Sequence, residues 1–159
     1  MIKLKHRIYY YNTLKFTLID DYEKARYSIE RKNRYDYNIN DLCYVEFIED
    51  SPCINNQVEV FRIFTNGQLW TAISYGGEIT LGKRDVHFSN DDIRLERDWF
   101  LHNYTTYYQD SILFKNSKKL FSFYHNIDIT NKELGCQAIA LAIAIDRLSH
   151  YDSERRIAW

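Results

Sequence analysis

Hydrophobic and polar residues alternate along most of the first 130 residues, in short runs that turn residues separate. Alternation with a period of two is typical of strands that bury one face of a sheet. The segments expected to form strands are residues 8–11, 14–19, 25–31, 43–48, 58–64, 69–73, 78–81, 93–97, 99–108, 111–114 and 120–124. Short strands with turn signals about every 8–12 residues predict a barrel or a sandwich.

Several dipeptides between these runs are expected to reverse the chain. An Asn-Gly pair between apolar runs is the strongest short hairpin signal, so Asn66 and Gly67 predict a tight turn. The other expected turns lie at Asp20–Asp21, Gly76–Gly77 and Asn116–Ser117. The segment 90–92, Asn-Asp-Asp, fits either a turn or the start of a short helix.

The pattern changes after residue 130. Residues 134–145, LGCQAIALAIAI, are almost entirely apolar, and a helix that is apolar on every side must be buried on every side. Thr130 and Glu133 have the spacing of a capping box, which marks a helix start. At about 1.5 Å per residue the run spans roughly 18 Å, well short of a bilayer of about 30 Å. We therefore expect an enclosed helix over residues 131–150 and a short C-terminal tail over 151–159.

Composition supports this picture and limits the function. Fourteen Tyr and nine Phe suit half-buried pleated surfaces. The net charge of −1 argues against an electrostatic surface for nucleic acid or anionic lipid. Cys43, Cys53 and Cys136 are odd in number and lack CxxC spacing, which favours a reducing, cytoplasmic setting. The charged N-terminus is not followed by the apolar stretch of a secretory signal. At 159 residues, we expect one domain.

About a dozen short strands followed by an apolar helix that ends in Ile143-Ala-Ile-Asp-Arg-Leu148 resemble the Tubby-like superfamily, which includes the LURP-one-related and phospholipid scramblase families. The resemblance is strongest over residues 96–148. It implies a mainly β fold, a closed antiparallel β-barrel of about twelve short strands around a C-terminal hydrophobic helix, as a single domain over residues 1–159. It also implies that the barrel surface binds a lipid headgroup or another small ligand. The cysteine cluster and the acidic calcium-binding segment of scramblases have no counterpart in this chain.

The sequence offers little catalytic chemistry. The five histidines are scattered without HxH or HExxH spacing, so no metal site and no cofactor are expected. The adjacent carboxylates at 20–21 and 91–92 fit turns better than acid–base chemistry, because neighbouring strand residues point to opposite faces. No glycine-rich phosphate loop or nucleophile elbow occurs. We expect a protein that is not an enzyme.

Two sets of residues are candidates for binding a ligand or partner. Trp99 and Tyr104 belong to an aromatic run that suits stacking, although such residues more often form core. Arg155, Arg156 and Trp159 in the tail suit an interface anchor, although a terminus more often frays.

Three functions therefore remain open. The first is a binding module for a lipid headgroup or small ligand, with peripheral lipid contact allowed. The second is an inhibitor of a protein partner, such as an antitoxin, an immunity protein or a phage-encoded anti-host factor. The third is a hydrolase or nuclease built from His102, His125 and nearby carboxylates.

Overall fold

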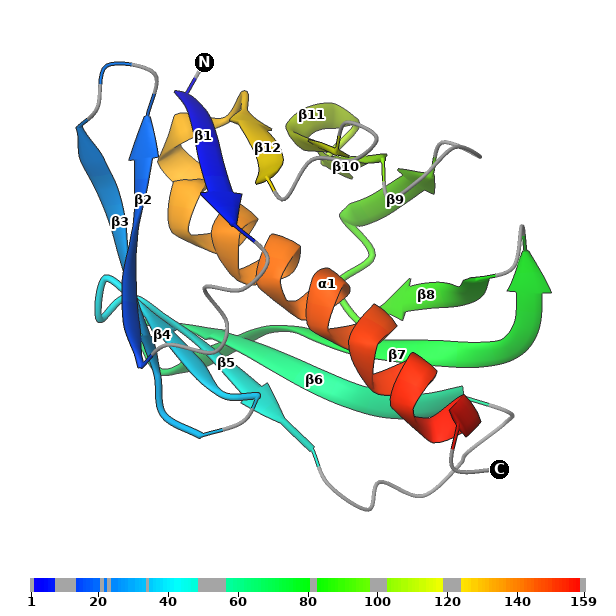
Figure 1. The fold of residues 1–159 in the computed structure, drawn as a ribbon. Helices are drawn as coiled ribbons and strands as arrows, with labels where there is room; N and C mark the ends of the chain where they lie inside the picture. Colours follow the sequence, from blue (N-terminus) through cyan, green and yellow to red (C-terminus); the bar gives the residue numbers. More distant parts are fainter. Residues whose placement is uncertain are drawn as a thin grey trace.

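A single curled sheet surrounds a helix in the computed structural model, which describes residues 2–7, 14–20, 22, 24–33, 35–48, 57–80, 83–97, 103–118 and 124–157 (Figure 1). The twelve strands are β1 (Ile2–Arg7), β2 (Lys15–Asp20), β3 (Ala25–Arg31), β4 (Tyr37–Ile39), β5 (Cys43–Phe47), β6 (Gln57–Thr65), β7 (Gln68–Thr80), β8 (Lys83–Phe88), β9 (Ile93–Arg97), β10 (Tyr104–Tyr108), β11 (Ser111–Lys118) and β12 (Tyr124–Ile129). A 3-10 turn, η2 (Lys132–Leu134), leads into the helix α1 (Gly135–Ile157). The predicted fold class is confirmed.

The sheet consists of two antiparallel meanders. Strands β1 to β8 follow one another in chain order, as do β9 to β12, and the pairing of β1 with β12 joins the two runs. Strands β8 and β9 are therefore the two edges of the sheet. They lie side by side where the barrel would close, and we call their facing sides the open edge (Figure 1).

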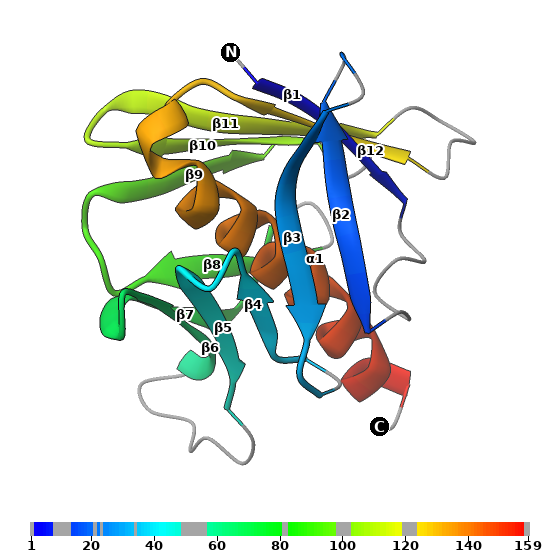
Figure 2. The ribbon, with the colours of Figure 1, turned by 90° about the vertical axis from the view of Figure 1, so that its left-hand side faces the viewer.

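Alternate residues of the strands fill the barrel, as the sequence pattern predicts. Tyr27 and Ile29 of β3 are buried, and so are Ile127 and Ile129 of β12, while Ser28 is exposed. Every residue of α1 from 135 to 145 is buried. Figure 2 shows the helix running through the barrel with strands on both sides of it. The apolar helix is thus enclosed by the sheet, which is the arrangement expected from its sequence.

The tight turns gather at the end of the barrel where α1 begins. Asn66 and Gly67 both have positive φ, 50° and 78°, so the predicted tight turn is confirmed. The backbone twist of a turn with positive φ at both central residues matches the right-handed twist of the strands on either side. Two more turns, at 40–41 and 109–110, also have positive φ at both central residues. Because neighbouring strands are antiparallel, the turns after β2, β4, β6, β8 and β10 all lie at this end.

Two predicted turns are wrong. Gly76 and Gly77 lie inside β7, at a shift in register between Tyr75 and Ile79 in the pairing with β8. Glycine within a strand often marks such a bulge, where the strand bends without reversing. Asn116 and Ser117 lie inside β11 and pair with Ile127 and Asn126 of β12.

The helix boundaries also differ from the prediction. The Thr130 N–H donates to the Leu113 carbonyl at 2.9 Å, so strand pairing uses the group that a capping box would need. The α-helix therefore begins at Gly135 after η2, instead of at 131. It continues to Ile157, so residues 151–157 are helical instead of a loose tail, because no Gly or Pro follows the apolar run to stop it.

Other local predictions have mixed outcomes. Strands β1, β4, β8 and β12 were not among the expected segments, because β1, β8 and β12 are rich in charged or polar residues and β4 is only three residues long. Residues 90–92 form a turn and not a helix. The expected strand at 8–11, and most of the one at 120–124, lie outside the described residues.

Replacing Ala142 with Asp tests the enclosure of the helix. Ala142 is 4% exposed, so a carboxylate there would be buried without a partner. We expect Ala142→Asp to lower the free energy of unfolding by at least about 3 kcal/mol in urea titration. Thr17→Asp, on an exposed position of β2, is the control and should change it by less than about 1 kcal/mol. Wild-type stability of Ala142→Asp would contradict an enclosed helix.

Asp20 makes the β2–β3 hairpin sensitive to acid. Its carboxylate accepts the N–H groups of Tyr22 and Lys24, each at 2.9 Å, and the Arg26 Nε–H at 2.6 Å. The bond from Arg26 holds the pKa of Asp20 below its usual value, against the opposing effect of burial. A lowered folded pKa means that this stabilisation is complete above the unfolded pKa of about 3.9 and is lost as pH falls toward the folded value.

We therefore expect the wild type to lose more stability than Asp20→Asn between about pH 5 and pH 2. Urea titrations at a series of pH values measure this. Asp110→Asn, in the exposed turn after β10, is the matched control and should follow the wild-type pH dependence. If Asp20→Asn followed it too, Asp20 would not be the acid-sensitive group.

Candidate functional site: an interior polar cluster

Polar side chains meet inside the barrel where the apolar part of α1 ends. His125 of β12 is 3% exposed and Asn116 of β11 is 5% exposed. The Asn116 Nδ2 lies 3.4 Å from Nδ1 of His125, and the Nε2 of His125 lies 4.0 Å from Oδ1 of Asp146 on the helix. These three residues, with Tyr104 of β10 and Arg97 of β9, form what we call the interior polar cluster.

The hydrogen bond to Asn116 determines where the His125 proton lies. An amide nitrogen only donates, so Nδ1 of His125 accepts and the neutral ring carries its proton on Nε2. That proton faces the Asp146 carboxylate.

Tyr104 and Arg97 extend the cluster toward the open edge. Burial raises the pKa of the Tyr104 phenol well above its usual range, the Asp146 carboxylate raises it further, and Arg97 opposes both. The Tyr104 ring also packs edge-on against Phe114, with ring centroids 5.8 Å apart. Tyr104 is therefore a neutral donor within the field of both charged groups.

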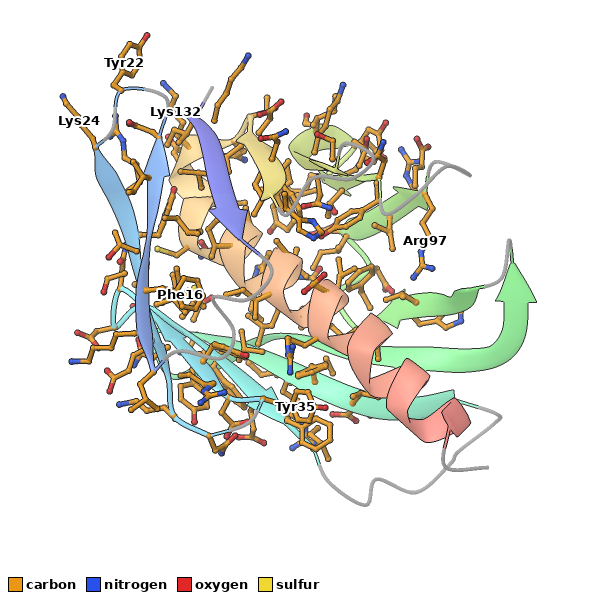
Figure 3. All side chains as sticks on the ribbon, in the orientation of Figure 1. Phe16, Tyr22, Lys24, Tyr35, Arg97 and Lys132 are labelled. Atoms are coloured by element: carbon orange, nitrogen blue, oxygen red, sulfur yellow. The ribbon has the colours of Figure 1, made fainter. Side chains whose placement is uncertain are left out.

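Alternation along the edge strand places Arg97 on the inner face. Ile93 is buried and Leu95 half-buried, whereas Arg94 and Glu96 are exposed, so Arg97 shares the inward-facing set. Figure 3 shows its side chain extending from β9 toward β8. Asp146 keeps 26% of its side chain exposed, so the cluster is not sealed from solvent.

A second group of polar contacts lies on the other side of the helix. The guanidinium of Arg147 lies 4.9 Å from the centre of the Tyr35 ring. Burial raises the pKa of the Tyr37 phenol, while Arg147 and Arg31 lower it. Asp146 also raises the pKa of Tyr37, so this carboxylate acts on the tyrosines of both groups, Tyr104 and Tyr37.

The described thiols are unsuited to nucleophilic chemistry. Burial raises the pKa of Cys43 to about 11 and also raises the pKa of Cys136. A reactive thiol needs the opposite shift and access to solvent. Cys53 lies outside the described residues.

The structure describes three of the five residues that the sequence suggested for binding, Tyr104, Arg155 and Arg156. Tyr104 packs against the core as well as joining the interior polar cluster. Arg155 and Arg156 lie in the last turns of α1 and not in a loose tail, so the chain there is regular helix. Trp99, Trp159 and His102 lie outside the described residues.

Sequence reasoning did not select Arg97, Asn116 or Asp146. Two signals were present: His125 falls in a buried position of an alternating run, and Asp146 follows directly on an apolar helix. Only the pairing of β11 with β12 and the passage of α1 beside them bring the groups together. In the described part of the chain, no three His, Cys, Asp or Glu side chains converge as a metal site requires.

A double-mutant cycle tests whether His125 and Asp146 act as a pair. We expect His125→Gln and Asp146→Asn each to destabilise the fold, and the double variant to show a coupling energy of about 0.5–3 kcal/mol. Urea unfolding of the four proteins measures it. His125→Gln combined with Arg62→Gln, on β6, is the control and should be additive within about 0.5 kcal/mol. Additivity of His125→Gln and Asp146→Asn would show that the pair does not act as a unit.

Comparisons with known proteins give one distant likeness. No family model matches the chain, and no curated protein does. A crystal structure of a protein from Arabidopsis thaliana is similar over 93% of this chain and 91% of that one, at 12% identity and a TM-score of 0.42. In the described part of the chain, no helix has the length and apolar character needed to cross a membrane. A likeness at this level assigns neither a family nor an activity.

Proposed function

We propose that the chain is a non-catalytic binding module of the Tubby-like kind, which holds the anionic headgroup of a lipid or of a small phosphate ester at the interior polar cluster. The observation that carries this proposal is the position of the cluster. An arginine, a tyrosine, a histidine and an aspartate converge inside an apolar barrel, next to the side on which its strands are unpaired.

The composition of the helix supports a functional role for the cluster. Buried polar groups cost stability unless they are well paired, and apolar packing in their place is often as stable or more so. From Ala138 to Ile145 the helix is wholly apolar and buried, yet Asp146 brings a carboxylate to the same barrel. A few polar groups among apolar walls are typical of ligand sites.

The chemistry of the cluster favours a phosphate-bearing ligand. The planar Arg97 guanidinium can donate two parallel hydrogen bonds to a pair of phosphate oxygens, a bidentate contact. The Tyr104 hydroxyl remains a donor because its pKa is raised. Asp146 suits the hydroxyl groups that accompany phosphate in glycerol or inositol headgroups, since a carboxylate accepts their hydrogen bonds.

Binding is preferred to catalysis because of how His125 is held. The ring is almost fully buried between Asn116 and Asp146, which restricts its approach to a substrate. The described thiols, Cys43 and Cys136, have raised pKa values. A hydrolase would need a nucleophile and a base within reach of the same bound group.

Ligand titration with an arginine variant tests the proposal. We expect glycerol 3-phosphate, or vesicles of phosphatidylcholine containing phosphatidic acid, to raise the melting temperature or to bind in calorimetry. Binding of the free ester would indicate a small-molecule ligand, and binding of vesicles alone a lipid. Arg97→Gln should weaken binding about tenfold, or about 1.4 kcal/mol, because a charged hydrogen bond to phosphate is lost.

Arg62→Gln is the matched control, since Arg62 lies on β6 and pairs with Glu59. It should leave affinity unchanged. Binding of neither probe, or equal weakening by both variants, would contradict the proposed site. Turnover of a phosphate ester that His125→Gln abolishes would contradict the non-catalytic role.

A further inference from the structure

Apolar side chains also gather on the outer face of the sheet, away from α1. Cys43 and Val45 of β5 are buried inside the barrel, so Tyr44 between them points outward. Tyr44 pairs with Phe64 of β6, and Phe64 pairs with Leu69 of β7. Because directly paired residues of antiparallel strands point to the same face, these three side chains form one row across the outer face.

Leu42 lies beside this row. Its carbonyl oxygen accepts the Asn66 N–H at 3.0 Å, which holds the turn before β5 against the turn before β7. Leu69 is 53% exposed and Leu42 is 38% exposed. They are two of the five large apolar side chains that are exposed in the described part of the chain. We call the whole set the outer apolar patch: Leu42, Tyr44, Phe64 and Leu69.

Carboxylates border the outer apolar patch. Asp41 is exposed and directly precedes Leu42 in the turn before β5. The Asp36 carboxylate accepts the Tyr44 hydroxyl at 3.2 Å. Glu46 is the next outward residue of β5 after Tyr44, since strand residues two apart share a face. Acidic groups therefore lie on the sides of the patch formed by β4 and β5.

Among the described residues, one cation stands beside these carboxylates. Arg62 of β6 lies opposite Glu46 in the strand register, and its Nε–H donates to the Glu59 carboxylate. The border of the patch thus holds four carboxylates, at 36, 41, 46 and 59, and one guanidinium, so four anions and one cation give −3. On the neighbouring strand β3, Glu30 pairs with Lys32, and the two add no net charge.

The ionisable groups at the patch respond to this negative charge. Burial raises the pKa of the Tyr44 phenol, and the Asp36 and Glu46 carboxylates raise it further. Glu59 raises the pKa of Arg62, and Glu46 adds to that effect. Nearby carboxylates shift both groups in the direction expected from an excess of negative charge. The same carboxylates would stabilise a cationic group placed over the patch.

We propose that the outer apolar patch docks a basic, amphipathic segment of a partner protein. An apolar side chain of the segment lies between Leu42 and Leu69, and its lysine or arginine side chains lie over Asp41 and Glu46. An apolar centre with a polar rim is the usual anatomy of a protein interface. The opposite charges steer the approach of the partner and discriminate against acidic proteins.

This inference is independent of the small ligand proposed above, because the outer apolar patch and the interior polar cluster lie on opposite faces of the sheet. It also gives a physical basis to the second functional class, an inhibitor that masks a protein partner. A second copy of this chain is the competing occupant. Joining two copies patch to patch would bring like charges together, which disfavours that pairing.

Synthetic peptides test the inference directly. The probe is a fluorescent peptide of about nine residues in which lysine alternates with leucine. One control peptide has glutamate in place of lysine, and another has serine in place of leucine. Fluorescence anisotropy measures affinity, and sedimentation measures self-association of the protein. We expect the lysine–leucine peptide to bind at least about tenfold more tightly than either control peptide.

Variants of the protein locate the bound peptide. Leu69→Ser should weaken binding of the lysine–leucine peptide about fivefold, because an apolar contact is lost. Leu14→Ser, at a leucine that is 67% exposed before β2, is the matched control and should alter affinity less than twofold. Glu46→Lys should weaken binding of the lysine–leucine peptide and strengthen binding of the glutamate–leucine peptide, a reversal that misfolding does not produce. Glu133→Lys makes the same charge change at an exposed position of η2 and should alter neither affinity more than twofold.

Other results would overturn the inference. Equal binding of the lysine–serine peptide would mean that charge alone is recognised, and equal binding of the glutamate–leucine peptide would remove the charge preference. Equal effects of a patch variant and its control would place the peptide elsewhere on the protein. Failure of the lysine–leucine peptide to bind, or self-association that Leu69→Ser abolishes, would exclude the proposed partner.

Discussion

Burial of the apolar helix is the constraint on which the rest of the structure depends. Residues 135–145 of α1 have no exposed face, so a flat sheet packed on one side would leave apolar surface in water. Curling the sheet around the helix covers all sides. The pairing of β1 with β12 makes this possible, because it joins strands from opposite ends of the sequence into one continuous sheet.

The same arrangement explains where the barrel is weakest. Strand pairing runs without interruption from β8 through β1 to β9, and the two strands left at the ends are joined by a short turn. Trp70 and Tyr108 cover the interior near that turn, but Val86, Phe88 and Leu95 remain partly exposed. An enclosed helix therefore coexists with one side of the sheet whose backbone and apolar groups are available for interaction.

The interior polar cluster occupies a related position. Its members come from β9 to β12 and from the point at which α1 changes from apolar to polar sequence. Asn116 sets the tautomer of His125, and Asp146 acts on both His125 and Tyr104. Polar chemistry and incomplete closure thus lie on the same side of the molecule, and the proposed binding site rests on this coincidence.

The sequence by itself determined the local features with strong short-range causes. Alternation identified β2, β3, β5, β6 and β9, the Asn66–Gly67 pair specified its turn, and uniform apolarity required an enclosed helix. Weaker local signals were overridden. Glycines at 76–77 became a bulge because β7 pairs with β8 both before it, at Tyr75, and after it, at Ile79, and Asn116 stayed in β11 because Ile127 of β12 pairs with it.

Tertiary structure alone decided the rest, because it depends on contacts between residues far apart in the chain. The helix start moved to Gly135 once Leu113 had engaged the Thr130 N–H. The interior polar cluster joins Arg97 to Asp146, and no periodicity in the sequence links positions so distant. The choice of β8 and β9 as edges follows from the closure of β1 on β12, which the sequence pattern does not encode locally.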